Sequence, residues 1–156
     1  SLAKEISGYT LRSEIGYFNQ DKEDDFVLGV IGIYREWGCI FNTVDSLYTL
    51  LQYANEMKTQ DTDPVGFETI DFRRIFNNAI LGKVTYSFDD SNTWKAKLTG
   101  VYNLSDHDSY IEPAVTWSKR DFDIEAGVDV MSGPRDTFFG GYSQNDRFFI
   151  TMTYKF

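Results

Sequence analysis

The sequence predicts an all-β chain, in which about eight antiparallel strands follow one another up and down. Three observations carry this prediction. Apolar residues recur at every second position in most segments, no segment sustains the i, i+3, i+4, i+7 spacing of an amphipathic helix, and the expected connections are uneven in length. With 156 residues the chain has the size of one domain, and we take residues 1–156 as a single unit.

The last four predicted strands show the cleanest alternation. Between residues 93 and 104, Trp94, Leu98 and Tyr102 fall on one face, and Lys95 and Lys97 fall on the other. Residues 110–118, 122–130 and 147–156 repeat the pattern, each with one apolar face and one polar or charged face. A period of two over such lengths is typical of a β-strand with two different environments.

The first four predicted strands are less regular. Residues 9–18 and 77–88 alternate with interruptions, whereas residues 26–36 are apolar on both faces. Residues 40–56 alternate only weakly, with Leu47, Leu51 and Tyr53 on a shared face. A helix across residues 44–57 is therefore the main local alternative to a strand.

The expected connections alternate between long and short. They are residues 19–25, 36–39, 57–73, 89–92, 105–109, 119–121 and 132–144. If the strands run up and down, the short connections share one rim and the long ones share the other, which is how the two rims of a membrane barrel differ.

Aromatic residues gather beside the short connections and at the C-terminus. They are Trp37, Phe88, Trp94, Trp117, Phe122, Tyr154 and Phe156. A looser group flanks the long loops and consists of Tyr17, Phe26, Tyr53, Tyr102 and Phe148. Aromatic rings favour the boundary between lipid and water, and strands of roughly 9 to 11 residues can cross the hydrocarbon at a tilt. Because only a closed sheet leaves no backbone group unpaired in lipid, we predict a transmembrane up-and-down antiparallel β-barrel.

The polar faces of the strands are expected to line the lumen of this barrel. The candidate lumen residues are Arg12, Glu14, Lys83, Lys95, Lys97, Glu112, Asp123, Glu125, Asp129, Arg147 and Lys155. We disfavour a soluble barrel of the lipocalin type, since burying so many charges would carry a large desolvation cost.

The end of the chain carries a recognisable pattern. The last predicted strand has apolar residues at alternate positions and a terminal aromatic residue, namely Phe148, Ile150, Met152, Tyr154 and Phe156. In this the chain resembles bacterial outer-membrane β-barrel proteins, in which the barrel-assembly machinery reads such a strand as an assembly signal. The resemblance implies that machinery as a partner, contact with lipid and lipopolysaccharide, and an outer-membrane location with both termini in the periplasm.

Two further segments are similar to the C-terminal portions of larger porin-like proteins. They are residues 10–18 and residues 138–147. This similarity implies that the chain is part of a wider barrel or of a homo-oligomer, whereas the strand count taken alone fits a complete, closed barrel of about eight strands.

The sequence argues against several other functions. The formal net charge of -9 disfavours nucleic acid as a partner. Cys39 and His107 are the only residues of their kinds and lack the spacing of a metal site. Lipid A deacylases of barrel type use a His-x-Ser pair with an acidic partner, but the residues around His107, Ser109 and Glu112 do not resemble that motif. We therefore predict no catalytic residue, no cofactor and no metal.

The leading functional prediction is a non-enzymatic, porin-like wall that allows passive passage of small polar solutes. The first alternative is a closed eight-stranded barrel that acts as a structural or surface-interaction protein through its long loops. The second alternative is a lipid A-modifying outer-membrane enzyme.

Overall fold

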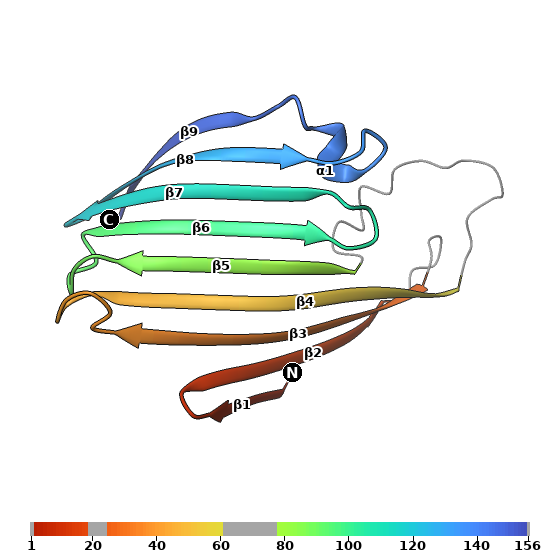
Figure 1. The fold of residues 1–156 in the computed structure, drawn as a ribbon, viewed down its shortest axis with the longest axis horizontal. Coiled ribbons are helices and arrows are strands. Elements are labelled where there is room, and N and C mark those ends of the chain that lie inside the picture. The colour runs from red at the N-terminus through yellow and green to blue at the C-terminus, as the bar shows by residue number, and fades with distance from the viewer. Residues whose placement is uncertain (1, 19–24, 61–77, 156) are drawn as a thin grey trace.

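The chain folds into one antiparallel sheet in a computed structural model that describes residues 2–18, 25–60 and 78–155 (Figure 1). The elements are β1 (Leu2–Ile6), β2 (Tyr9–Phe18), β3 (Asp25–Gly38), β4 (Ser46–Gln60), β5 (Ala79–Ser87), β6 (Trp94–Asn103), β7 (Ser109–Lys119), β8 (Phe122–Ser132), the short helix α1 (Phe138–Gly141) and β9 (Arg147–Tyr154). Every strand pairs with the next one in the sequence, so the sheet is a simple meander in the order β1 to β9.

The all-β, antiparallel prediction is confirmed, with nine strands in the described residues where about eight were expected. The additional strand is β1, which is too short to show a clear period. A two-residue turn joins β1 to β2, and both of its residues, Ser7 and Gly8, have positive φ angles of 53° and 77°. Such a turn matches the twist of the strands it connects.

The helix considered for residues 44–57 is wrong, because Ser46–Gln60 forms the strand β4. This strand pairs with β3 on one side and β5 on the other. β4 forms a strand despite its weak alternation, because its backbone N–H and C=O groups are hydrogen-bonded to the strands on both sides.

The final strand is shorter than predicted. Residues 147–156 were expected in it, but β9 ends at Tyr154, and Phe156 lies outside the described residues.

The connections gather at two rims, as expected for a meander (Figure 1). One rim, called the short-turn rim here, carries residues 7–8, 39–45, 88–93 and 120–121. The opposite rim carries residues 104–108 and 133–146 among those described. The predicted difference in length is looser than the sequence suggested, because residues 39–45 at the short-turn rim form a longer connection than residues 104–108 opposite.

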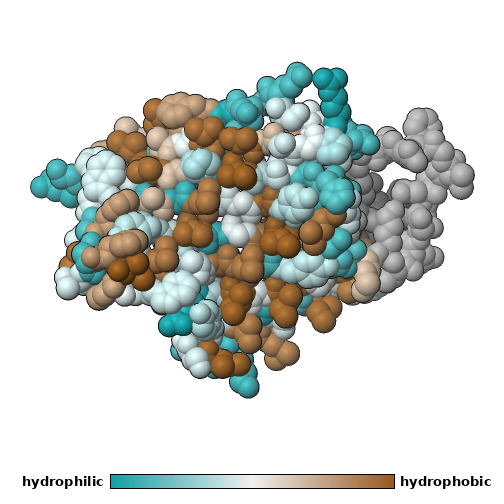
Figure 2. Space-filling model, viewed as in Figure 1, coloured by the Kyte–Doolittle hydropathy of each residue, from teal (hydrophilic) through white to brown (hydrophobic). Residues whose placement is uncertain are grey.

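The two faces of the sheet differ in a way that is unusual for a protein in water. Apolar side chains gather on one face, which Figure 2 shows over the middle of the strands. On this apolar face Phe148, Ile150 and Met152 are 66%, 65% and 65% exposed. Among the described residues the buried side chains are largely small or polar. The buried polar ones are Asp45, Ser87, Asn103, Asp108 and Asp129. The sheet therefore exposes its apolar face, while several polar side chains are buried, which is the reverse of ordinary burial.

The edges of the sheet are formed by β1 and β9. The pairing that the structure describes runs from β1 to β9 and does not join these two strands to each other. Because antiparallel neighbours alternate in direction and the sheet has nine strands, β1 and β9 run in the same direction. A continuous antiparallel ladder cannot be made by pairing these two edges.

Candidate functional site

The register of β6 to β9 brings charged side chains together on the polar face. Thr99 lies opposite Glu112 across β6 and β7, and Thr116 lies opposite Glu125 across β7 and β8. Asp129 lies opposite Arg147 across β8 and β9. Directly opposed residues in a sheet point to the same side, so the register places these side chains side by side on one face.

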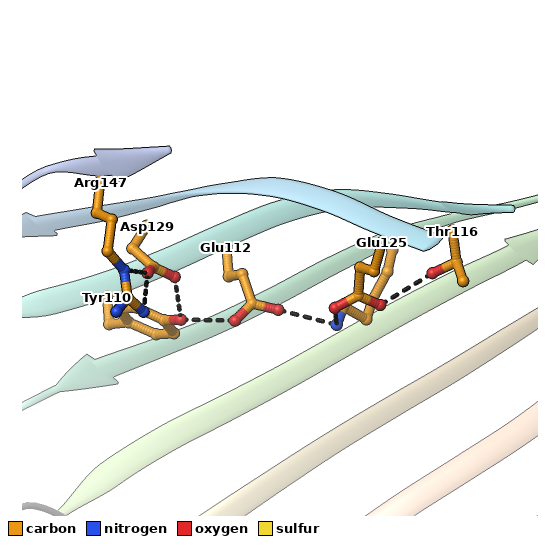
Figure 3. A network of polar contacts seen from close by, with 7 residues as sticks. Tyr110, Glu112, Thr116, Glu125, Asp129 and Arg147 are labelled. Carbon is orange, nitrogen blue, oxygen red and sulfur yellow. Dashed lines mark hydrogen bonds and ion pairs between the residues drawn. The ribbon is translucent and has the colours of Figure 1, made fainter. Parts of the chain in front are cut away.

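At the centre of this face Lys97 joins two glutamates. Its Nζ atom lies 2.9 Å from Glu125 Oε1 and 3.0 Å from Glu112 Oε1. Thr116 donates its hydroxyl hydrogen to the other oxygen of Glu125 at 2.9 Å. One ammonium group thus compensates two carboxylates that come from different strands (Figure 3).

Tyr110 extends the cluster toward the rim opposite the short-turn rim, where residues 104–108 and 133–146 lie. Its hydroxyl oxygen lies 2.7 Å from Glu112 Oε2 and 2.7 Å from Asp129 Oδ1. Asp129 is 2% exposed, and its other oxygen accepts from Nε of Arg147 at 2.7 Å. The result is a continuous chain of polar contacts from β6 to β9, which we call the polar network: Lys97, Tyr110, Glu112, Thr116, Glu125, Asp129 and Arg147 (Figure 3).

The connection between β8 and β9 packs onto the same face. Phe139 of α1 is buried and its ring stacks on that of Tyr110, with centroids 5.8 Å apart. The fully buried Asp108 accepts the backbone N–H of Phe139 at 2.8 Å, which fixes α1 above the network. The connection therefore folds over the polar face instead of extending away from the sheet.

Strand register places ten of the predicted lumen residues on the polar face, and the eleventh, Lys155, lies one residue beyond β9 and meets that face through its ion pair with Asp123. The structure brings together only some of them. Arg12 and Glu14 on β2 form a separate pair 2.6 Å apart, and Lys155 pairs with Asp123 at 2.6 Å. Lys83 and Lys95 share the face without an ion pair among the described residues. Their role as a lumen lining stays a prediction.

Tyr110, Thr116 and Asp108 belong to the site but were not among the predicted site residues. Tyr110 and Thr116 could have been found, because they lie two and four positions from Glu112 along β7 and so share its face. Asp108 carries no such signal, since its partner Phe139 lies far away in the sequence and meets it only through the fold.

Aromatic rings pair on the apolar face at the short-turn rim. Trp94 and Trp117 lie with centroids 6.5 Å apart, and Phe122 and Tyr154 lie 4.9 Å apart. Further pairs join Tyr9 with Trp37, Tyr86 with Phe88, and Tyr86 with Phe41. Six of the seven predicted belt residues thus lie in aromatic pairs at this rim, and the seventh, Phe156, is outside the described residues.

The loop of residues 39–45 at this rim is organised by one buried carboxylate. Asp45 accepts the backbone N–H groups of Ile40 at 2.7 Å and Phe41 at 2.8 Å, and the hydroxyl of Tyr86 at 2.6 Å. Burial acts to raise the pKa of Asp45, but these hydrogen bonds and one from the backbone of Asn42 outweigh it and hold the pKa below 3.8. The loop presents Phe41 as one of the most exposed side chains of the structure.

Other kinds of site find little support in the described residues. His107 is exposed, and its Nδ1 atom faces the hydroxyl of Tyr102 at 3.4 Å. Residues 2–18, 25–60 and 78–155 contain no group of three or more potential metal ligands. Within the same residues no helix has the length and apolar character needed to cross a membrane. No known protein family, curated protein or solved structure matched the chain.

Proposed function

We propose that the chain forms the wall of an outer-membrane β-barrel with a porin-like role, the passive passage of small polar solutes along its polar face. The observation that carries the proposal is the reversed burial of the sheet, with exposed apolar side chains on one face and, on the other, a group of sheltered charges that includes Lys97, Glu112 and Asp129. A hydrocarbon environment around the apolar face would make this arrangement favourable, because the apolar side chains would then leave water.

The free energy gained by removing the apolar face from water supports lipid as its environment. Fully burying one large apolar side chain contributes roughly 1.5–3 kcal/mol, and the face exposes such residues on every strand from β2 to β9. Soluble monomers rarely expose continuous apolar patches beyond a few hundred Å². The aromatic pairs at the short-turn rim fit the same environment, since their rings combine an apolar body with a polarisable or polar edge.

The open edges favour a wider barrel over a closed eight-stranded one. In lipid, the free N–H and C=O groups at the edges of β1 and β9 would each carry a cost of several kcal/mol. Because β1 and β9 run in the same direction, the antiparallel ladder is continued by further strands and not by these two edges together. We propose that such strands, of the same polypeptide or of other copies in a homo-oligomer, complete the barrel.

The polar network gives the proposed lumen its chemistry. It combines cationic and anionic groups, so it offers hydrogen bonds to a polar solute without a strong field of one sign. The α1 connection covers one end of this face and would narrow the passage there.

The outer membrane is proposed from the resemblance of the last strand to bacterial outer-membrane barrels. Phe148, Ile150, Met152 and Tyr154 present a regular apolar stripe on β9 that the barrel-assembly machinery could bind. Lipid and lipopolysaccharide would contact the apolar face. The end of β9 lies at the short-turn rim, which we propose is periplasmic. β1 begins away from that rim and runs toward it, so the start of β1 does not lie at the periplasmic rim.

One observation favours the alternative of a structural barrel without a passage. The polar network and the packed α1 segment fill part of the space over the polar face, as side chains do inside a small closed barrel. In this alternative the loops carry the function and the charges only stabilise the interior.

A planar-bilayer recording of the purified full chain tests the proposal and separates it from the alternative. The expected result is membrane insertion with stable conductance steps. A Glu112→Gln, Glu125→Gln double variant should shift ion selectivity toward anions, because it leaves the Lys97 charge uncompensated. Insertion without conductance would favour the structural barrel, and a monomer that stays soluble without detergent would refute the membrane wall itself.

A further inference from the structure

Arg35 is one of the few cations on the apolar face, together with Lys4 on β1 and Lys119 at the end of β7. Arg35 on β3 pairs with Thr49 and has Ile33 and Trp37 as its nearest neighbours on the same face. Its guanidinium carbon lies 4.5 Å from the ring centroid of Tyr9 and 5.1 Å from that of Trp37. The two rings meet edge to face at 6.2 Å. Arg35 is thus held by aromatic rings on the surface for which we propose lipid.

The guanidinium is held against the rim without a carboxylate. A Cβ atom placed on Gly8 would lie 3.8 Å from the Nε, Cζ and Nη2 atoms of Arg35, so the group covers the β1–β2 turn. Arg12 and Arg147 are paired with acids, but no carboxylate pairs with Arg35 among the described residues. Contacts to ring faces leave the in-plane N–H groups of a guanidinium free to donate.

An apolar groove runs along the same face next to this cation. It is lined by apolar side chains, mainly Leu11, Ile31, Ile33, Leu51, Tyr53 and Ile80. Ile33 lies two positions from Arg35 on β3, on the side away from Trp37, so the groove follows Arg35 along the strand toward the middle of the sheet, while the guanidinium lies at the rim. A cation at the rim and a hydrocarbon-lined groove beside it match the two parts of a phospholipid, its phosphate and its acyl chain.

We propose that Arg35, held by Tyr9 and Trp37, binds the phosphate of an anionic phospholipid whose acyl chain lies in the adjoining groove. The inference rests on the proposed membrane wall and adds a lipid site at its short-turn rim. Two parallel N–H donors of the guanidinium suit two oxygens of a phosphate, which a lysine ammonium at this position would not reproduce. Inorganic phosphate shares the headgroup chemistry but has nothing to place in the groove.

The experiment is native mass spectrometry of the full chain in detergent micelles, titrated with phosphatidylglycerol, with glycerol phosphate or with inorganic phosphate. We expect Arg35→Gln to weaken phosphatidylglycerol binding about tenfold, the scale of one charge-assisted contact. Arg35→Lys should fall between the two proteins. Arg12→Gln is the matched control, because Arg12 lies on the polar face, and its binding should equal that of the unaltered chain. Circular dichroism in the same micelles checks that each variant keeps its β-sheet.

Three outcomes overturn the inference. Equal binding by Arg35→Gln and the unaltered chain would remove Arg35 from the site. Binding of inorganic phosphate or glycerol phosphate as tight as that of the lipid would show that the groove takes no acyl chain. An equal loss in Arg12→Gln would show a general charge effect. If the chain inserts into bilayers in any of these cases, the proposed wall stands while the lipid site falls; failure to insert refutes both.

Discussion

The polar face differs between the two halves of the sheet. In β6 to β9 ion pairs join neighbouring strands, and the side chains of Lys97 and Glu112 within this group are 21% and 20% exposed. On β2 the corresponding pair, Arg12 and Glu14, lies within one strand, and its side chains are 57% and 47% exposed. Ion pairs between strands link β6 to β9, whereas the pair on β2 joins two residues of the same strand. The polar face is therefore cross-linked by ion pairs over β6 to β9 and more exposed to solvent at β2.

The difference predicts where the sheet tolerates change. Removing one partner of a sheltered bridge is costly, because it leaves the other charge buried and unpaired, whereas exposed pairs contribute about 0–1 kcal/mol. The halves should therefore respond unequally to equivalent substitutions.

The largest effect is expected from Lys97→Met. This change leaves Glu112 and Glu125 without their shared cation, and we expect a loss of about 3 kcal/mol in the free energy of unfolding. The measurement is urea unfolding in detergent micelles followed by circular dichroism. Arg12→Met is the matched control in the open half and should lose less than about 0.5 kcal/mol.

A rescue experiment sharpens this comparison. Adding Glu112→Gln and Glu125→Gln to Lys97→Met removes the uncompensated charges and should recover most of the lost stability. Equal losses for Lys97→Met and Arg12→Met would contradict the difference between the halves. Failure of the triple variant to recover would show that packing of the lysine stem, not charge, matters at this position.

An intermediate effect is expected from Gly127→Ala on β8. The new Cβ atom would lie 2.7 Å from Cζ of Phe149 and 2.8 Å from the carbonyl oxygen of Pro113. Because backbone cannot easily move, we expect a loss of about 2 kcal/mol in the same unfolding measurement. Gly82→Ala on β5 is the control, since a Cβ there meets nothing within 4 Å. A harmless Gly127→Ala would mean that β8 packs more loosely than described.

The smallest effect is a pH dependence confined to the loop of residues 39–45. The pKa of Asp45 is lowered from 3.8, because the hydrogen bonds it accepts outweigh its burial. A lowered pKa contributes stability at pH values above 3.8, and this contribution is lost as the pH falls through the lower folded value. We expect Asp45→Asn to lack this acid-sensitive share of the unfolding free energy.

The measurement is the urea midpoint at neutral pH and at successive acid pH values for both proteins. Asp90→Asn, a change of an exposed carboxylate three residues beyond the end of β5, should keep the acid response of the unaltered chain. An identical acid response in Asp45→Asn would place the acid-sensitive group elsewhere in the protein.

Sequence reasoning located the strands because their signal is local. Residues such as Lys95, Lys97, Glu112 and Glu125 alternate with apolar neighbours, and a period of two is enough to assign them to one face. It missed β1, whose few residues alternate too briefly, and it left a helix open for the weakly patterned β4. The sequence pattern also did not predict that Asp45 organises the loop of residues 39–45, because hydrogen bonds to backbone N–H groups do not depend on the pattern of neighbouring side chains.

The two faces of the sheet, the approximate number of strands and the crowding of aromatic residues near the turns all followed from the sequence. The pairing of Lys97 with two glutamates, the stacking of Phe139 on Tyr110 and the position of Arg35 against two rings are visible only in the folded chain. The physical reason is that alternation follows from the geometry of a single strand, whereas partners on different strands are fixed by register and by the path of the connections. The same register gives the sheet nine strands with edges that run in one direction, which no local pattern could have shown.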